Sequence, residues 1–598
     1  AFISGMVGKF FKEFGLTITA ASLFSLFVSF TITPMLASRF FKGKEDSKNK
    51  ISSGKMERFK KSWLYKIFNT ISSSIDNVTI TYKKVLIWSL DHRKRVLLLS
   101  IAGLIAVILL IPAGAIGTEF IPTTDQSMFN VNMTFDSGSS LNQMDKTVKQ
   151  VENHLHKMPE ISSYYSSVGA DNASLMGGNS NSASIYVKLK PKKERKKSQS
   201  NIAKGLRRWA DLSLSGTDFS VVESDVGSGS SKPISIQILG SDTHTINEIS
   251  NKVENIVKNV PGVIDVDNSS KISESEFRVQ IDKLAASQYG ITTQDVSSVL
   301  RLAIEGSPGG IYRTNGNDYD IMVKFQDGDI KTPSDIGSVN ILNQSGESIP
   351  LNEIATISRA DSPQSISRQN RQDAVTISAN IQGKTLGEIN KVLSKKLKSF
   401  SLPEGYEIKF GGNQEDMKDS FTSLIEALII SLVLIYMILV VLYESFLTPF
   451  IRMISLPCAL IGAFGILAIT GKTLNIMSMI GLIMLDGLAS KNGTLLIDYT
   501  NTLMKRGKNL REALIESGER RLRPIIMTSA TMIVGMLPSA LSIGEGSELK
   551  SSMSVIVIGG MIASTIFTPI ILPIVYTLMD DLKKHIFKKK KHVEIQEV

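Results

Sequence analysis

The sequence predicts an α-helical membrane bundle joined to an α+β exterior domain. Three observations support this fold class. Apolar runs lie toward both ends of the chain, and a bilayer span needs about 20 mostly apolar residues. The stretch 117–420 is polar and alternates strand-like with helix-like patterns. Most of the net charge of +11 flanks the apolar runs, so this charge does not indicate a nucleic-acid partner.

Seven apolar runs are predicted to cross the membrane: 16–38, 96–116, 421–442, 453–470, 474–497, 522–542 and 553–578. The loop after the first run is dense in Lys and Arg, which places it in the cytoplasm by the positive-inside rule. Alternation then places 117–420 outside and the basic stretches 505–521 and 583–591 inside. The three basic clusters therefore agree on one multi-pass topology. The pattern of residues 59–90 predicts an amphipathic helix. This helix either lies on the membrane surface or simply connects two spans.

The exterior stretch reads as two sets of strands and helices. Residues 126–225 follow the order βαββαβ, which is typical of a ferredoxin-like unit. A second set comes in two pieces, 234–267 and 374–410, each reading strand, helix, strand. About 276–362 is inserted between these pieces. Its glycine run Gly306-Ser-Pro-Gly-Gly310 predicts a turn at a domain edge, because the Lys-Ser/Thr of a phosphate loop does not follow it.

Two charged residues interrupt the apolar run 474–497. A charge at a bilayer centre costs ~2.5–3.5 kcal/mol on insertion scales, so Asp486 and Lys491 should face protein or water and mark an ion or proton pathway. They are five residues apart, which is about 140° around a helix, so they do not share a face. No other run has a central carboxylate. We expect the partner of Lys491 in a part of the protein outside this chain, since Ala1 begins inside an apolar segment.

Enzyme and cofactor chemistry find no support in the residue pattern. Cys458 is the single cysteine, and the six histidines are scattered, which argues against a metal site. No nucleophile motif is present. The sequence therefore predicts neither an enzyme of covalent chemistry nor a bound cofactor.

Four segments carry a resemblance to a known family: GGNQEDMKDSF (411–421), LYESFLTPF (442–450), GLASKNGTLLIDY (487–499) and RRLRPIIMTS (520–529). Together they resemble the C-terminal portion of resistance-nodulation-division (RND) efflux transporters of the multidrug, hydrophobe/amphiphile branch. The resemblance implies a proton-driven permease of the bacterial inner membrane that exports hydrophobic or amphiphilic compounds. It also implies a homotrimer, with a periplasmic adaptor and an outer-membrane channel as candidate partners. The upstream half of such a transporter would then be absent from this chain.

The resemblance divides the chain into subdomains. They are the last span of the first half with its preceding loop (1–38), a basic cytoplasmic loop with the amphipathic helix (39–95), a span (96–116), the first porter subdomain (117–230), the second porter subdomain (231–275 and 363–420), an inserted docking subdomain (276–362), a five-span bundle (421–578) and a basic cytoplasmic tail (579–598).

The resemblance also implies a proton relay. Lys491 matches a family lysine that pairs with two aspartates of the first half, and Asn492 follows it as in the family. Arg521 and Thr528 match the rest of the relay. Asp486 stands where an apolar residue is usual. It either adds a proton site or holds Lys491, or it pairs structurally with a hydroxyl.

Cargo contact in the family relies on aromatic residues of the first porter subdomain. Tyr165 matches one such position, with Tyr164 beside it, although a plain surface pair is the alternative. The aromatics expected after them are replaced by Ala170-Asp-Asn172.

Two other functions stay open. A heavy-metal pump of the same superfamily would carry an acidic residue at Lys491 and methionines in the exterior cleft, where Met176 and Met322 are isolated. A membrane export or lipid-handling module would not depend on Lys491.

Overall fold

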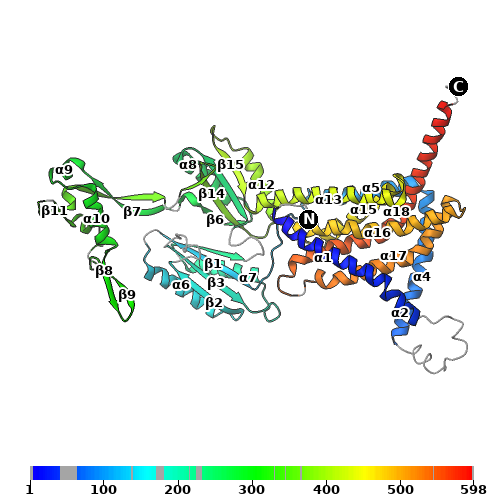
Figure 1. The fold of residues 1–598 in the computed structure, drawn as a ribbon, viewed down its shortest axis with the longest axis horizontal. Coiled ribbons are helices and arrows are strands. Elements are labelled where there is room, and N and C mark those ends of the chain that lie inside the picture. Colours follow the sequence, from blue (N-terminus) through cyan, green and yellow to red (C-terminus); the bar gives the residue numbers. More distant parts are fainter. Residues whose placement is uncertain are drawn as a thin grey trace.

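The computed structural model describes residues 5–594 except 41–62, 137–138, 170–180, 215, 224–231, 272, 327, 329, 331, 344, 364–365 and 543. The molecule is elongated, with a helical bundle at one end, two sheet domains beside it and a small domain at the far end (Figure 1). Most of the basic loop predicted within 39–95 lies outside the described residues.

Six helical stretches of the described residues are long and apolar enough to cross a membrane: Phe11–Arg39, Asn413–Tyr443, Leu447–Thr470, Ile476–Lys505, Leu510–Ala540 and Glu548–Lys584. They correspond to α1 (Gly5–Phe30) with α2 (Ile32–Phe40), α13 (Asn413–Tyr443), α14 (Leu447–Met453) with α15 (Ser455–Thr470), α16 (Ile476–Lys505), α17 (Leu510–Ala540) and α18 (Glu548–Glu594). Their outer faces are apolar, and Phe30 and Val441 are 75% and 80% exposed. Such faces suit contact with lipid.

The predicted span 96–116 differs from the structure. Its helix, α5 (Arg93–Leu109), has 17 residues and ends before the predicted boundary. Pro112 follows closely, and proline disfavours helical backbone at the residue before it. The helix is therefore shorter than a typical span of about 20 residues.

The helix predicted over 59–90 is α4 (Trp63–Asp91). It lies at the end of the bundle away from the sheets, as does the C-terminal end of α18 (Figure 1). Tyr82, Leu86 and Leu90 are buried with Leu522 of α17 and Ile574 of α18. α4 is thus packed on the bundle by its apolar face.

The first sheet domain comprises residues 128–223. Its elements are β1 (Met128–Phe135), α6 (Leu141–His156), β2 (Ile161–Val168), β3 (Ser182–Leu189), α7 (Gln199–Ser213) and β4 (Thr217–Glu223). The strands form an antiparallel sheet in the order β2-β3-β1-β4. Phe129, Val131 and Met133 alternate into its core, as a strand with one buried face requires.

The second sheet domain comprises residues 234–268 and 367–411. Its elements are β5 (Ile234–Gly240), α8 (Thr243–Lys258), β6 (Val263–Asn268), β13 (Ser367–Gln369), β14 (Gln372–Ile381), α12 (Leu386–Lys398) and β15 (Glu407–Gly411). β14 lies between β5 and β6, and β15 pairs with the other edge of β5. Helix α13 follows β15 after Gly412, so this domain leads directly into the membrane bundle.

The inserted domain comprises residues 273–363. A two-stranded ribbon of β7 (Ser273–Ile281) and β12 (Ala355–Pro363) carries it. The rest consists of α9 (Lys283–Gln288), α10 (Thr293–Ile304), β8 (Ser307–Thr314), β9 (Asn317–Val323), α11 (Pro333–Gly337), β10 (Asn340–Leu342) and β11 (Ser348–Pro350).

The glycine run was predicted to be a turn, and this prediction is wrong. Gly306 has a positive φ of 84°, but the residues after it form β8 and pair with β9. The pairing register shifts between Pro308 and Gly310. Glycine and proline therefore make a bulge within a hairpin strand here.

Candidate functional site

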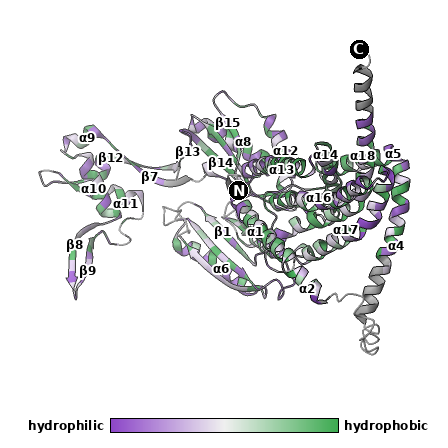
Figure 2. Ribbon diagram, turned by 45° about the vertical axis from the view of Figure 1, so that its right-hand side comes forward, coloured by the Kyte–Doolittle hydropathy of each residue, from purple (hydrophilic) through white to green (hydrophobic). Residues whose placement is uncertain are grey.

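Helix α16 is the central polar helix of the bundle. A capping box between Asn475 and Ser478 starts it, and both side chains are fully buried. It is packed mainly against α18 and α17 and, less extensively, against α15, α13 and α14. The ribbon of the surrounding bundle is coloured mostly as hydrophobic (Figure 2).

Lys491 lies on an exposed side of α16, whereas Asn492 is buried at 2% exposure. Asn492 Nδ2 donates to Ser564 Oγ of α18 at 3.4 Å, and Ser564 is hydrogen-bonded to Thr568 at 3.2 Å. Within the part of the chain that the structure describes, no carboxylate forms a salt bridge with the Lys491 ammonium. The hydrogen bond of Asn492 therefore holds this turn of α16 against α18, while the Lys491 ammonium faces outward.

Asp486 points elsewhere. It is 4% exposed, and its carboxylate accepts a hydrogen bond from Ser431 Oγ of α13 at 3.4 Å. Arg452, on α14, attracts this carboxylate only at longer range, because no hydrogen bond or ion pair joins the two side chains. The structure thus places the Ser431 hydroxyl beside Asp486, with the charge of Arg452 farther away, and it does not bring Asp486 to Lys491.

Sequence reasoning missed Arg452. Its side chain is buried, and Nε donates to the carbonyl of Ser490 at 3.0 Å while Nη2 approaches Ser490 Oγ at 3.3 Å. A single arginine just before the apolar run 453–470 has the pattern of a flanking surface charge. Only the inward turn of the short helix α14 buries it.

Arg521 and Thr528 lie seven residues apart on α17, which places them on one face, two turns apart. The Arg521 guanidinium lies over the ring of Tyr499 on α16, 4.7 Å from its centroid. Its Nε is buried and lacks a hydrogen-bond partner among the described residues. Thr528 Oγ1 donates to the carbonyls of Pro524 and Ile525, both at 3.0 Å. The predicted relay residues therefore occupy two packed helices, with Arg521 in contact with the helix of Lys491.

The two tyrosines do not form one surface. Tyr165 is 70% exposed and pairs across the sheet with the exposed Tyr186 of β3. Tyr164 is half-buried against the core of the first sheet domain. Adjacent residues of a strand point to opposite faces, which separates them. Ala170-Asp-Asn172 lies outside the described residues.

A short segment joins the bundle to the second sheet domain. We call Gly117–Phe120 the strap. Thr118 bridges Leu474, just before α16, and Glu119 N donates to Leu474 O at 3.1 Å. On its other side, Gly387 N of α12 donates to Thr118 O at 2.9 Å. The strap therefore links the start of α16 to the start of α12 through backbone hydrogen bonds.

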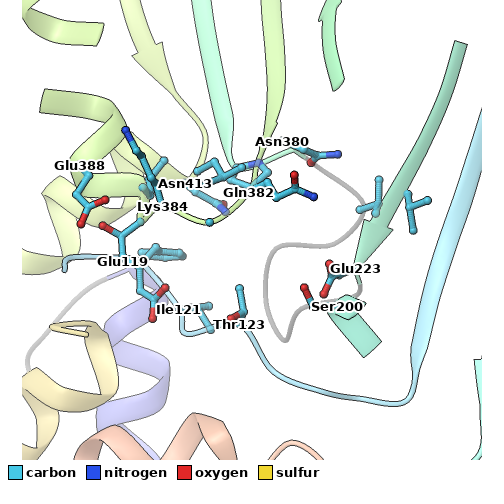
Figure 3. A pocket seen from close by; sticks show the side chains of 18 of the residues that line it. Glu119, Ile121, Thr123, Ser200, Glu223, Asn380, Gln382, Lys384, Glu388 and Asn413 are labelled. Carbon is cyan, nitrogen blue, oxygen red and sulfur yellow. The ribbon is translucent and has the colours of Figure 1, made fainter. Parts of the chain in front are cut away.

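A cleft of about 420 Å³ lies between the two sheet domains beside the strap (Figure 3). Apolar side chains, among them Ile121 and Val221, share its wall with six charged side chains: Glu119, Lys204, Arg207, Glu223, Lys384 and Glu388. Arg207 Nε of α7 lies 3.5 Å from an Asp265 carboxylate oxygen of β6, so an ion pair joins the two domains here.

Two carboxyl groups of the cleft are held in unusual surroundings. Burial raises the pKa of Glu119 above its ordinary value, against a hydrogen bond from Thr473 and the charge of Lys472. Burial likewise raises the pKa of Glu223, against the charge of Arg207 and a hydrogen bond from Ser200. No sequence motif marked these residues, because they come from segments far apart in the chain.

Metal ligands do not gather in the described parts of the chain. No group of three or more His, Cys, Asp or Glu side chains there is arranged to hold an ion.

Comparison with known proteins gives relatives along nearly the whole chain. The model of the AcrB/AcrD/AcrF family matches residues 1–580. The swarming motility protein SwrC of Bacillus subtilis is 27% identical over 587 residues, covering 98% of this chain and 53% of SwrC. The multidrug resistance protein MdtC of Proteus mirabilis is 25% identical over 596 residues, covering 99% of this chain and 55% of MdtC.

Metal-transport proteins are among the relatives as well. The cobalt-zinc-cadmium resistance protein CzcA of Cupriavidus metallidurans is 25% identical over 595 residues, covering 96% of this chain and 53% of CzcA. The crystal structure of a heavy metal efflux pump matches with a TM-score of 0.76 at 22% identity, covering 84% of this chain and 52% of that chain. Identity this low shows a shared fold alone. The chain spans about half the length of these relatives.

Proposed function

Because the chain belongs to the AcrB/AcrD/AcrF family of RND efflux permeases, we propose that it serves proton-driven export of hydrophobic or amphiphilic compounds. Its place is a bacterial inner membrane, which its multiple apolar helices would cross. The working unit is a homotrimer, with a periplasmic adaptor and an outer-membrane channel as further partners where the envelope has them.

Lys491 is the single observation that carries the proton-coupling proposal. An ammonium on a membrane helix needs an anionic partner or water, and such residues mark proton pathways. Protonation of partner carboxylates outside this chain removes their attraction for the ammonium. The position of α16 that the ion pair stabilised then loses this stabilisation, and the equilibrium shifts toward a second position of the helix.

The strap offers a route from this shift to the exterior domains. Leu474 stands two residues before α16, and its backbone N and O are bonded to Gly117 O and Glu119 N. Thr118 in turn accepts from Gly387 at the start of α12. A displacement of α16 would therefore move α12 and the wall of the cleft, which is a domain rearrangement of the hinge or shear kind.

The composition of the cleft wall favours an amphiphilic cargo. The wall mixes apolar side chains with acidic and basic ones. Binding pockets combine apolar surface with a few polar groups that orient the ligand, and this wall offers both. Heavy-metal cations are the second candidate cargo, favoured by the similarity to CzcA.

The first test is Lys491→Ala in the protein at its full natural length, with efflux of a fluorescent amphiphile measured at matched membrane abundance. We expect loss of proton-driven efflux. Lys505→Ala, at the exposed cytoplasmic end of the same helix, is the matched control and should transport normally. Unchanged efflux in Lys491→Ala would overturn the relay role. A host that gains zinc or cobalt tolerance without amphiphile efflux would assign the metal cargo instead.

A further inference from the structure

Two opposite charges are buried in the bundle, one on α16 and the other on the adjacent helix α14. Asp486 and Arg452 are 4% and 8% exposed. The carboxylate accepts from Ser431 of α13, and it attracts the guanidinium across to α14. Each charge alone would be costly inside a membrane, and each compensates the other. Asp486 and Ser490, which accepts from Arg452, are four residues apart on α16, so both lie on one face of this helix.

The arginine is anchored on α16 at the turn that contains Lys491. Arg452 Nε and Nη2 reach the carbonyl and hydroxyl of Ser490, at 3.0 and 3.3 Å. The same carbonyl accepts from Thr494 Oγ1 at 2.9 Å. The stem of Arg452 lies along Gly493, where an added Cβ would stand 3.4 Å from Arg452 Cγ. The arginine thus touches the residue before Lys491 and a residue just after it.

These contacts restrict rotation of α16. A helix turns as a rigid unit, so fixing the Ser490 carbonyl also fixes the direction of the next side chain, about 100° away. Buried ion pairs contribute little net stability compared with apolar side chains of similar volume. Orientation of α16 is therefore a better explanation for two buried charges than stability alone.

We propose that Arg452 and Asp486 are positioning residues for transport: the negative charge of Asp486 compensates the buried charge of Arg452, and Arg452 holds the Ser490 turn so that Lys491 faces its relay partners. The inference rests on the proposed function, because it acts through Lys491. It also gives Asp486 a role other than proton uptake.

The test compares four variants of the protein at its full natural length. Asp486→Asn removes the charge and keeps the size, and Asp486→Glu restores the charge. Arg452→Met combined with Asp486→Leu removes both charges, so neither is left unpaired. Glu426→Gln, at an exposed carboxylate of α13, is the matched control. The readouts are membrane abundance, the maximal efflux rate and the cargo concentration at half-maximal rate.

A positioning role predicts a drop in the maximal rate of about tenfold for Asp486→Asn and for the double variant, with half-saturation unchanged. Asp486→Glu should recover most of the rate, and Glu426→Gln should match the unchanged protein. A double variant that reaches normal abundance and transports at the normal rate would overturn the proposal. If the double variant fails to accumulate, a normal rate in Asp486→Asn, or no recovery in Asp486→Glu, would overturn it.

Lys491→Ala separates this inference from the function it rests on. If that variant transports normally, the proposed relay fails and the positioning role fails with it. If that variant is inactive while Asp486→Asn and the double variant are normal, only the positioning role fails.

Discussion

Replacing Arg195 by methionine is expected to destabilise the first sheet domain by about 3–5 kcal/mol, the usual cost of breaking a buried ion pair from one side. The Arg195 side chain is 1% exposed and pairs with Asp125, which is 11% exposed. Its other nitrogens donate to the carbonyls of Lys190 and Lys197 at 3.0 and 2.8 Å. Methionine fills similar space but leaves one buried charge and two carbonyls without this donor.

The magnitude follows from burial rather than from charge alone. Lys192 and Glu548 also form an ion pair, but their side chains are 41% and 18% exposed. Exposed pairs contribute about 0–1 kcal/mol, so Lys192→Met should have little effect and serves as the matched control. Combining Arg195→Met with Asp125→Leu removes both buried charges and should recover much of the lost stability.

The loss should also reach the membrane bundle. Asp125 O accepts from Gly546 N at 3.2 Å, and Ser127 donates to Glu545 at 3.1 Å, both in the loop before α18. Opening the Arg195 site therefore loosens the contact between the first sheet domain and this loop. In Arg195→Met, hydrogen exchange should become faster both in the peptides that contain β1 and α7 and in the loop before α18.

A pH series checks the electrostatic part. Burial opposes ionisation of Asp125, but hydrogen bonds from Arg195 and from the backbone of Gln199 and Ser127 hold its pKa below the ordinary 3.8. A lowered pKa stabilises the fold above pH 3.8, and this contribution disappears as the pH falls through the folded-state pKa. Arg195→Met should remove that contribution.

The measurement is thermal and denaturant unfolding of the detergent-solubilised protein, together with hydrogen exchange. A loss of less than about 1 kcal/mol in Arg195→Met, equal to that of the surface control, would refute the reasoning.

Three further predictions concern close packing and the cleft. Gly462→Ala should lower the melting temperature, because the added Cβ would stand 2.1 Å from the Gly559 carbonyl oxygen of α18. Gly465→Ala is the control and should not lower it, because no atom lies within 4 Å of its Cβ position. Equal melting temperatures for the two variants would contradict this packing. Gly387→Ala should cost about 1–3 kcal/mol, because its Cβ would meet the Thr118 carbonyl at 2.9 Å and a carbonyl cannot rotate away; unfolding midpoints check it. Glu119→Gln should stabilise the protein at neutral pH. Burial raises the pKa of Glu119, so the free energy of unfolding of the unchanged protein falls as the pH rises from 4.5 through the folded-state pKa. A variant whose unfolding free energy depends on pH as steeply as that of the unchanged protein would disprove this.

Periodicity predicted the elements of the exterior domain well. Phe129, Val131, Met133 and Phe135 alternate in the sequence, and all four are buried in β1. Alternation of this kind is a local consequence of strand geometry, so it can be read without knowing the rest of the fold. The prediction of a turn at the glycine run from Gly306 failed for the opposite reason. A bulged hairpin strand depends on its partner β9, and local composition does not reveal this pairing.

Part of the candidate site could likewise be predicted from local sequence, and part could not. Apolar length and flanking charge indicated a membrane bundle, and spacing alone showed that Asp486 and Lys491 face different ways. Helical spacing gives the direction of a side chain but not what it meets. Ser431 lies 55 residues away from Asp486 in the sequence, and Arg452 looked like a flanking charge.

The sequence by itself determined that several segments are long and apolar enough to cross a membrane, and that Asp486 and Lys491 point in different directions, because these properties follow from local hydropathy and helical spacing. Only the tertiary structure decided that Asp486 accepts from Ser431, that Arg452 holds the Ser490 turn, and that Glu119, Arg207 and Glu223 share one cleft. Such contacts depend on how distant helices and sheets pack, and packing selects partners through shape and burial that no local pattern records.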